Sequence, residues 1–150
     1  MNKYRCICLV ICLLNLSCVC VKEVPDLIDL QVQKITSRRW VAGVEKAGSG
    51  YTVEVFLKAS IKDPLELYQV YYKGLVGKLN KESSLYYTAN LIDKETSKEN
   101  QLDIIPDNYQ KISDQQLLLI IKSNNKNKYY LHEQIDKLDP LFYPSVNQKP

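Results

Sequence analysis

Apolar and polar positions alternate in short runs along most of the chain, which is the pattern of β-strands with one buried face. Residues 28–33 and 51–58 alternate strictly. Residues 39–44 alternate with Trp40 on the apolar side, so this single tryptophan is expected to face the core. Further strands are predicted over residues 65–73, 74–79, 84–92, 102–105 and 128–135.

Two segments depart from this alternation. Residues 117–121 read Leu-Leu-Leu-Ile-Ile, and a short apolar run of this kind is consistent with a strand that is covered on both faces. Residues 139–144 are also mainly apolar, but they contain Pro140 and Pro144. Because proline cannot donate to a sheet ladder, we expect this tail to lie extended over one edge.

The connections between the runs are rich in turn-forming residues. Residues 47–50 and 80–83 predict hairpin tips, and residues 123–127 predict a turn. A β-bulge at Gly74 or at Gly77 is expected, through which a strand continues. Seven to eight short strands joined by local turns, without an amphipathic helix, predict an all-β fold. An antiparallel β-sandwich is favoured over a small barrel because the strands differ in length and two connections are long.

The first 20 residues differ from the rest, because they contain all five cysteines of the chain. Lys3 and Arg5 precede an apolar stretch, and the small residue Ser17 comes directly before Cys18. This order of positive, apolar and small residues is typical of an export signal. The stretch is too short and too polar near its end for a membrane-spanning helix. Residues 1–17 are therefore predicted to be a signal peptide.

The pair Ser17-Cys18 also fits the processing site of a bacterial lipoprotein, which predicts lipid attachment at Cys18. Asn15 occupies a position where such sites usually carry an aliphatic residue. Ordinary cleavage near Cys18 or Cys20 is therefore the alternative. Lipid attachment places the protein in the cell envelope with the membrane as a partner, whereas ordinary cleavage places it in the periplasm or the medium. Residues 18–33 would form a tether with a possible first strand, and residues 34–150 a single β-sandwich domain.

Charge and composition exclude several functions. Lys3 and Arg5 belong to the signal segment, so 18 of the 20 basic residues and all 17 acidic residues remain beyond it. This near-neutral balance disfavours a nucleic-acid partner. Beyond residue 20 the sequence has no cysteine and a single histidine, His132, so we expect no metal site, no cofactor and no catalytic residue. A small hydrolase with two carboxylates is the least favoured alternative.

Tyrosine pairs are the first candidate for ligand contact. They occur at residues 71–72, 86–87 and 129–130, and alternation in a strand turns one ring of each pair outward. Outward Tyr72, Tyr87 and Tyr130 could form a strip that stacks on sugars or on a partner protein. The favoured interpretation is simpler, because tyrosine has a high strand propensity and often covers the open face of a sheet.

The cluster Arg38-Arg39-Trp40 is the second candidate. A cation–π contact between an arginine and the indole could fix a surface recognition patch. The favoured interpretation places Trp40 in the core and leaves Arg38 and Arg39 solvated.

Residues 37–43, Ser-Arg-Arg-Trp-Val-Ala-Gly, and residues 48–51, Gly-Ser-Gly-Tyr, resemble segments of small uncharacterised lipoproteins of Bacteroidota and flavobacteria. Those proteins share a leader that ends near a cysteine, a Trp-Val-Ala-Gly strand, a glycine-rich turn and a late strand with tyrosines, as in residues 128–130. The resemblance spans about residues 34–144. It implies export and a lipid anchor at Cys18, and it brings no activity.

The sequence as a whole predicts an exported cell-envelope lipoprotein whose β-sandwich is not catalytic. We expect a protein-interaction or structural module with an envelope protein as partner. The alternative is a carbohydrate-binding module that holds a polysaccharide on its outward tyrosines.

Overall fold

The computed structural model describes residues 30–43, 48–93 and 105–144. The predicted signal peptide, Cys18, most of the tether and most of the predicted strand 102–105 lie outside the described residues. The described part forms nine strands and one short 3₁₀ helix, η3 (Asp107–Tyr109). The strands are β1 (Val32–Val41), β2 (Ser49–Leu57), β3 (Leu65–Tyr72), β4 (Leu75–Lys78), β5 (Asn80–Lys81), β6 (Tyr86–Asp93), β7 (Leu117–Ser123), β8 (Lys126–His132) and β9 (Asp136–Phe142).

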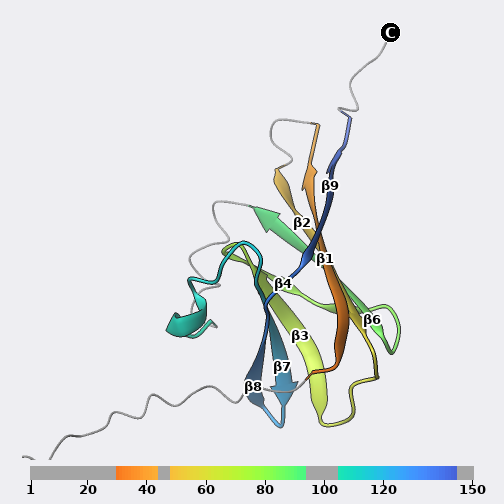
Figure 1. Cartoon of the computed structure of the whole chain (residues 1–150), viewed down its shortest axis with the longest axis vertical. Coiled ribbons are helices and arrows are strands. Elements are labelled where there is room, and N and C mark those ends of the chain that lie inside the picture. Colours follow the sequence, from red (N-terminus) through yellow and green to blue (C-terminus); the bar gives the residue numbers. More distant parts are fainter. Residues whose placement is uncertain (1–29, 44–47, 94–104, 145–150) are drawn as a thin grey trace, which may run out of the picture.

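These strands build two sheets, as Figure 1 shows. The five-stranded sheet has the order β5-β6-β2-β1-β9, and the four-stranded sheet has the order β4-β3-β7-β8. Only the β1–β9 pairing is parallel among the described strands, and all others are antiparallel. The predicted all-β sandwich is therefore confirmed.

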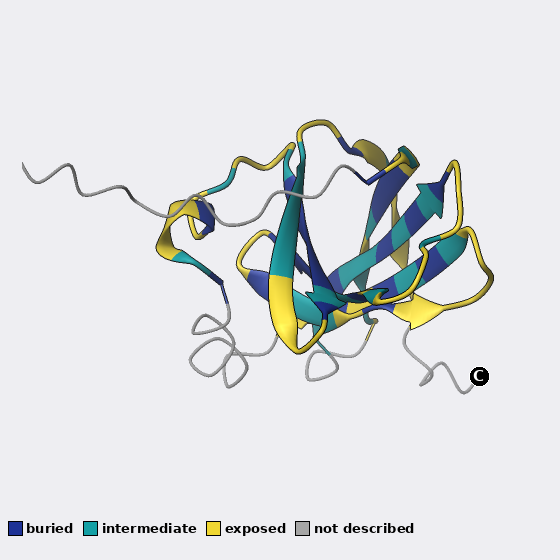
Figure 2. Cartoon of the chain, turned by 90° about the horizontal axis from the view of Figure 1, so that it is seen from below, coloured by how far each residue is buried: buried dark blue, intermediate teal, exposed yellow. Residues whose placement is uncertain are grey.

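The core lies between the two sheets. The five-stranded sheet contributes alternate residues of β2, such as Val53 and Val55, which are 0% exposed. The four-stranded sheet contributes alternate residues of β7, among them Leu119. Each such side chain stabilises the fold by about 1.5–3 kcal/mol relative to an exposed position. Figure 2 shows the resulting alternation of buried and partly buried positions along the strands.

Strand β7 is covered on both faces, as its unbroken apolar run predicts. Leu117, Leu119 and Ile121 face the core, whereas Leu118 and Ile120 belong to a second apolar cluster. That cluster lies on the other side of the four-stranded sheet. It is completed by Ile105, Tyr109 and Tyr71, with Ile112 packed against it.

Strand β1 corrects the prediction of two separate strands over residues 28–33 and 39–44. Polar Thr36 and Ser37 interrupt the apolar pattern, yet they are buried at 4% and 3% exposure inside one continuous strand. Hydrogen bonds allow this burial, because a satisfied hydroxyl costs little inside a protein. Thr36 Oγ1 donates to Glu54 at 2.8 Å, and Ser37 Oγ donates to the hydroxyl of Tyr72 at 3.4 Å.

The segment around Gly74 is a hairpin turn, so the prediction of a bulge there is wrong. Lys73 and Gly74 have φ angles of 52° and 78°, and Tyr72 pairs with Leu75 across them. Two consecutive residues with positive φ are the requirement of the tightest hairpin turns. Lysine is an unusual choice for the first position, so the sequence carries only half of the usual turn signal. Gly77 lies inside β4.

The C-terminal segment lies along one edge, as its prolines predict. It forms β9, which begins at Asp136 and pairs with β1 alone. In Figure 1 the upper ends of β1, β2 and β9 extend beyond the four-stranded sheet. Side chains at these ends therefore have no partner sheet opposite them, and Phe142 is 74% exposed.

Candidate functional site

The face of the five-stranded sheet that points away from the core, here called the outer face, carries an unusual set of side chains. The strand register defines its members, which have even numbers on β1, β2 and β6. They include Arg38 and Trp40 on β1, Thr52, Glu54 and Phe56 on β2, and Tyr86, Asn90 and Ile92 on β6. Aromatic, amide and charged groups thus stand side by side on one surface.

The first hollow on this face surrounds Trp40. It has a volume of about 310 Å³ and is lined by Trp40, Thr52, Asn90, Ile92 and Tyr143. The hydroxyl of Thr52 donates to Oδ1 of Asn90 at 3.0 Å. This bond leaves the NH₂ group of Asn90 available to donate to a ligand. An aromatic surface beside an amide and a hydroxyl can bind a ligand that is apolar on one side and polar at its edge.

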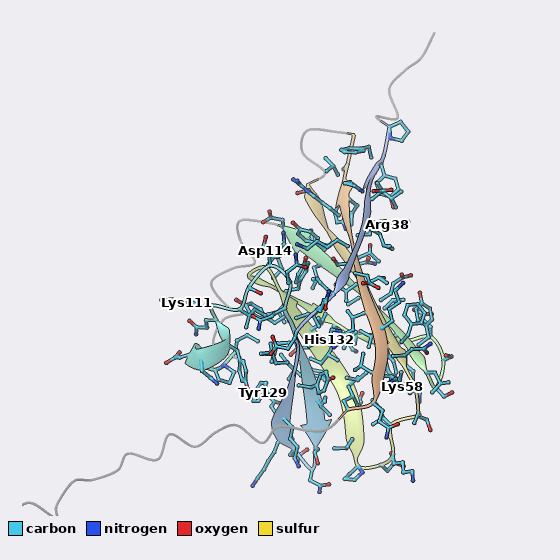
Figure 3. All side chains as sticks on the ribbon, viewed as in Figure 1. Arg38, Lys58, Lys111, Asp114, Tyr129 and His132 are labelled. Atoms are coloured by element: carbon cyan, nitrogen blue, oxygen red, sulfur yellow. The ribbon has the colours of Figure 1, made fainter. Side chains whose placement is uncertain are left out.

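Arg38 lies next to this hollow on the same face. Its Cα partners are Thr52 on β2 and Leu138 on β9, and Figure 3 shows it on the upper part of β1, where β9 runs beside it. Its Nε atom is buried without a hydrogen-bond partner. A buried donor that lacks an acceptor costs free energy, of order 1–3 kcal/mol and more for a charged group. Because Nε has no exposed surface, the terminal NH₂ groups of Arg38 are the donors open to an outside acceptor, and no described residue pairs with them.

A second hollow of about 310 Å³ lies farther along the outer face and includes Thr36, Glu54 and Phe56. Here Glu54 is already engaged, because it accepts hydrogen bonds from Thr36 at 2.8 Å and from the hydroxyl of Tyr86 at 2.9 Å. The ring of Tyr86 stacks on Phe56 at 4.8 Å between centroids. The hydrogen bond to Glu54, together with burial, raises the pKa of Tyr86. These contacts hold β2 to its neighbours β1 and β6.

A larger groove of about 600 Å³ lies where β3, β4 and β5 meet. Two carboxylates, Asp63 and Glu66, line it together with Lys78, Lys81 and Tyr87. Burial and the nearby charge of Glu66 raise the pKa of the Tyr87 hydroxyl. A pair of carboxylates in one groove is what the hydrolase alternative requires. Replacing them by Asn and Gln is therefore the direct test of that alternative.

The predicted outward tyrosine strip is not formed, because all three of its members point towards the core. Tyr72 is 1% exposed and Tyr87 is 5% exposed, and burial raises the pKa of each hydroxyl. Tyr72 packs edge-on against Tyr51 at 5.3 Å between centroids. Tyr130 is half-buried and packs against the core. Tyr71 is buried too, because both faces of the four-stranded sheet are covered.

The prediction that Trp40 faces the core is also wrong. The register of β1 turns Ile35 and Ser37 inward, so Trp40 stands half-buried on the outer face. Arg38 shares that face, whereas Arg39 belongs to the opposite face and is exposed. Of the predicted cluster, the structure therefore brings together Arg38 and Trp40 alone.

The sequence interpretation missed Thr52, Asn90 and Tyr143. The alternation over residues 51–58 could have indicated Thr52, because it stands opposite to the apolar residues of its strand. Asn90 and Tyr143 come from segments that only the sheet order places beside β1 and β2.

Among the residues that the structure describes, no group of three His, Cys, Asp or Glu side chains could hold a metal ion. Burial lowers the pKa of His132, which lies at the end of β8.

Comparisons with models of protein families, with curated proteins and with solved structures give no match. Within the described ranges, no helix is long and apolar enough to cross a membrane. The resemblance to lipoproteins of Bacteroidota and the lipid at Cys18 stay predictions.

Proposed function

We propose that the chain is an exported cell-envelope lipoprotein, anchored through Cys18, whose β-sandwich binds a partner without transforming it. The observation that carries the binding role is the outer face, where Trp40 lines a hollow and the guanidinium of the neighbouring Arg38 has no partner among the described residues. The signal-like pattern of residues 1–17 supports export. Without the lipid, the same domain would work in the periplasm or the medium.

A protein of the envelope is the first candidate partner. Three consecutive apolar side chains at the end of β9 support it, because Leu141, Phe142 and Tyr143 are 41%, 74% and 55% exposed. Large apolar and aromatic side chains of this kind form the centres of many protein interfaces. They lie at a sheet edge that extends beyond the other layer, where a partner has access.

A carbohydrate is the second candidate partner. The hollow around Trp40 supports it, with Tyr143 as a second ring and with Thr52 and Asn90 as hydrogen-bonding groups. This candidate replaces the predicted contact through Tyr72, Tyr87 and Tyr130, two of which are buried.

The envelope proposal is tested on the full chain, expressed in a bacterial host that processes lipoproteins. We expect mass spectrometry to show a mature N-terminus at an acylated Cys18, and labelled palmitate to enter the protein. Cys18→Ala should lose the label, whereas the matched variant Cys20→Ala should retain it. Full-length protein in the cytosol with Met1 attached would overturn the proposal.

A further inference from the structure

Trp40 presents a rigid aromatic surface on the outer face. Its Cα partner on β2 is Gly50, and a Cβ added there would lie 2.7 Å from the indole Cζ2 and 2.9 Å from Cε2. These distances are shorter than van der Waals contact, so the ring lies directly over the glycine. A ring supported in this way loses little conformational freedom when a ligand stacks on it.

The hollow beside the ring matches a single sugar in size and chemistry. Its volume of about 310 Å³ lies at the small end of ligand pockets. A pyranose has C–H groups on its faces and hydroxyls around its rim. The aromatic surfaces of Trp40 and Tyr143 suit those faces, and Thr52 and Asn90 provide hydrogen-bonding groups for the rim.

Arg38 adds a positive charge next to the hollow. It lies two residues before Trp40 on the same strand face, a separation of about 7 Å along the strand. Its Cα partner Thr52 lines the hollow. Two acidic groups of this face are already engaged: Glu54 accepts from Thr36 and Tyr86, and Asp136 on β9 pairs with Lys34 at 3.3 Å. No described residue pairs with the guanidinium of Arg38, and its two terminal NH₂ groups fit a carboxylate through two parallel hydrogen bonds.

We infer that the hollow around Trp40 binds a pyranose that carries a carboxylate, with the ring stacked on Trp40 and the carboxylate paired with Arg38. This inference rests on the proposed function, whose carbohydrate candidate it makes specific. Charge complementarity selects an acidic sugar over a neutral one.

The single tryptophan of the chain makes the site directly observable, because all indole fluorescence comes from Trp40. The probes are oligomers of galacturonic acid, alginate and hyaluronan, with methyl-esterified galacturonate oligomers as the uncharged match. We expect a saturable change in fluorescence with at least one acidic oligomer. If galacturonate is the ligand, its ester should bind about tenfold more weakly, because it lacks the charge-assisted hydrogen bonds.

Two neighbouring arginines provide a matched pair of variants. Arg38→Gln should weaken binding of the acidic oligomer about tenfold. In this variant, raising the salt concentration to about 1 M should lower the affinity much less than it does in the wild type. Arg39→Gln removes the same charge from the opposite face and should bind like the wild type. Trp40→Ala should lose retention on immobilised acidic polysaccharide, with circular dichroism showing that the domain is folded.

The inference is overturned if none of the three acidic oligomers changes the fluorescence. It is equally overturned if Arg38→Gln binds the acidic oligomer as tightly as Arg39→Gln does. It is also overturned if the ester binds as tightly as the acid. In each of these cases, an acylated Cys18 would still support the proposed function and would favour the protein partner. If the chain binds the sugar but is never exported, the proposed function is wrong and the inferred sugar site still stands.

Discussion

Gly50→Ala is expected to destabilise the domain far more than an ordinary strand substitution. Gly50 lies near the start of β2 and is buried between two neighbours. A Cβ at this position would lie 2.0 Å from the carbonyl oxygen of Leu91 on β6 and 2.7 Å from the Trp40 ring. The indole can rotate away, but the carbonyl belongs to the backbone of β6. The methyl group therefore fits only if β2 and β6 separate.

The cost of this separation has two parts. Overpacking a tight site costs about 1–3 kcal/mol. Moving the strands apart also breaks hydrogen bonds of the β2–β6 ladder, each worth about 0.5–1.5 kcal/mol, and loss of about two is expected. The total is about 4 kcal/mol, a large part of the 5–15 kcal/mol that typically stabilises a small domain.

Urea unfolding measures this cost, followed by the fluorescence of Trp40 and by circular dichroism. Gly74→Ala is the matched control, because Gly74 has a φ of 78° and no atom lies within 4 Å of the place that its methyl group would take. Its substitution introduces backbone strain alone, of about 1–2 kcal/mol. If Gly50→Ala costs no more than Gly74→Ala, then the backbones of β2 and β6 do not approach each other at Gly50 as closely as this prediction requires.

Three further predictions concern stability. Leu118→Ala and Leu119→Ala should each lower the free energy of unfolding in urea by about 2–5 kcal/mol, because both side chains are 0% exposed although they belong to opposite faces of β7. A loss below about 1 kcal/mol for Leu118→Ala would contradict the second apolar cluster. Burial lowers the pKa of His132 below its ordinary 6.5, so the unfolded chain takes up this proton first, and stability should fall as the pH drops through 6.5 towards the folded pKa. Melting temperatures measured against pH should show this fall, and His132→Gln should reduce it. Lys73 donates to Asp114 at 2.9 Å and lowers the pKa of that carboxyl below 3.8, so this pair stabilises the fold above that pH and loses its effect as the pH falls through the lowered pKa. Asp114→Asn should therefore reduce the fall of the melting temperature at acid pH. An unchanged fall would show that the pair contributes nothing.

Much of the fold could be predicted because its signals are local. Asn124 and Asn125 adopt positive φ angles of 48° and 64° in the β7–β8 turn, and asparagine tolerates this conformation better than most residues. The apolar run 117–121 indicates a strand covered on both faces. The predictions fail where a distant partner compensates for a local signal, as at buried Thr36, whose hydroxyl is satisfied by Glu54.

The candidate site could be predicted only in part. Arg38 and Trp40 stand out in the sequence because two arginines precede the single tryptophan. Alternation places Trp40 and Arg38 on one side of the strand and Arg39 on the other, but the size and apolar character of the indole favour the core. Asn90 and Tyr143 carry no signal of their own. They reach the hollow through the pairing of β6 with β2 and of β9 with β1.

By itself, the sequence determined the fold class, the turns at its asparagines and the residues that share a side of each strand, because a two-residue period and backbone preferences act over a few neighbours. The tertiary structure decided which side of each strand meets the other sheet, since that choice depends on the apolar area that all strands bury together. It therefore decided that Tyr72 and Tyr87 are core residues and that Trp40 stands on the outer face.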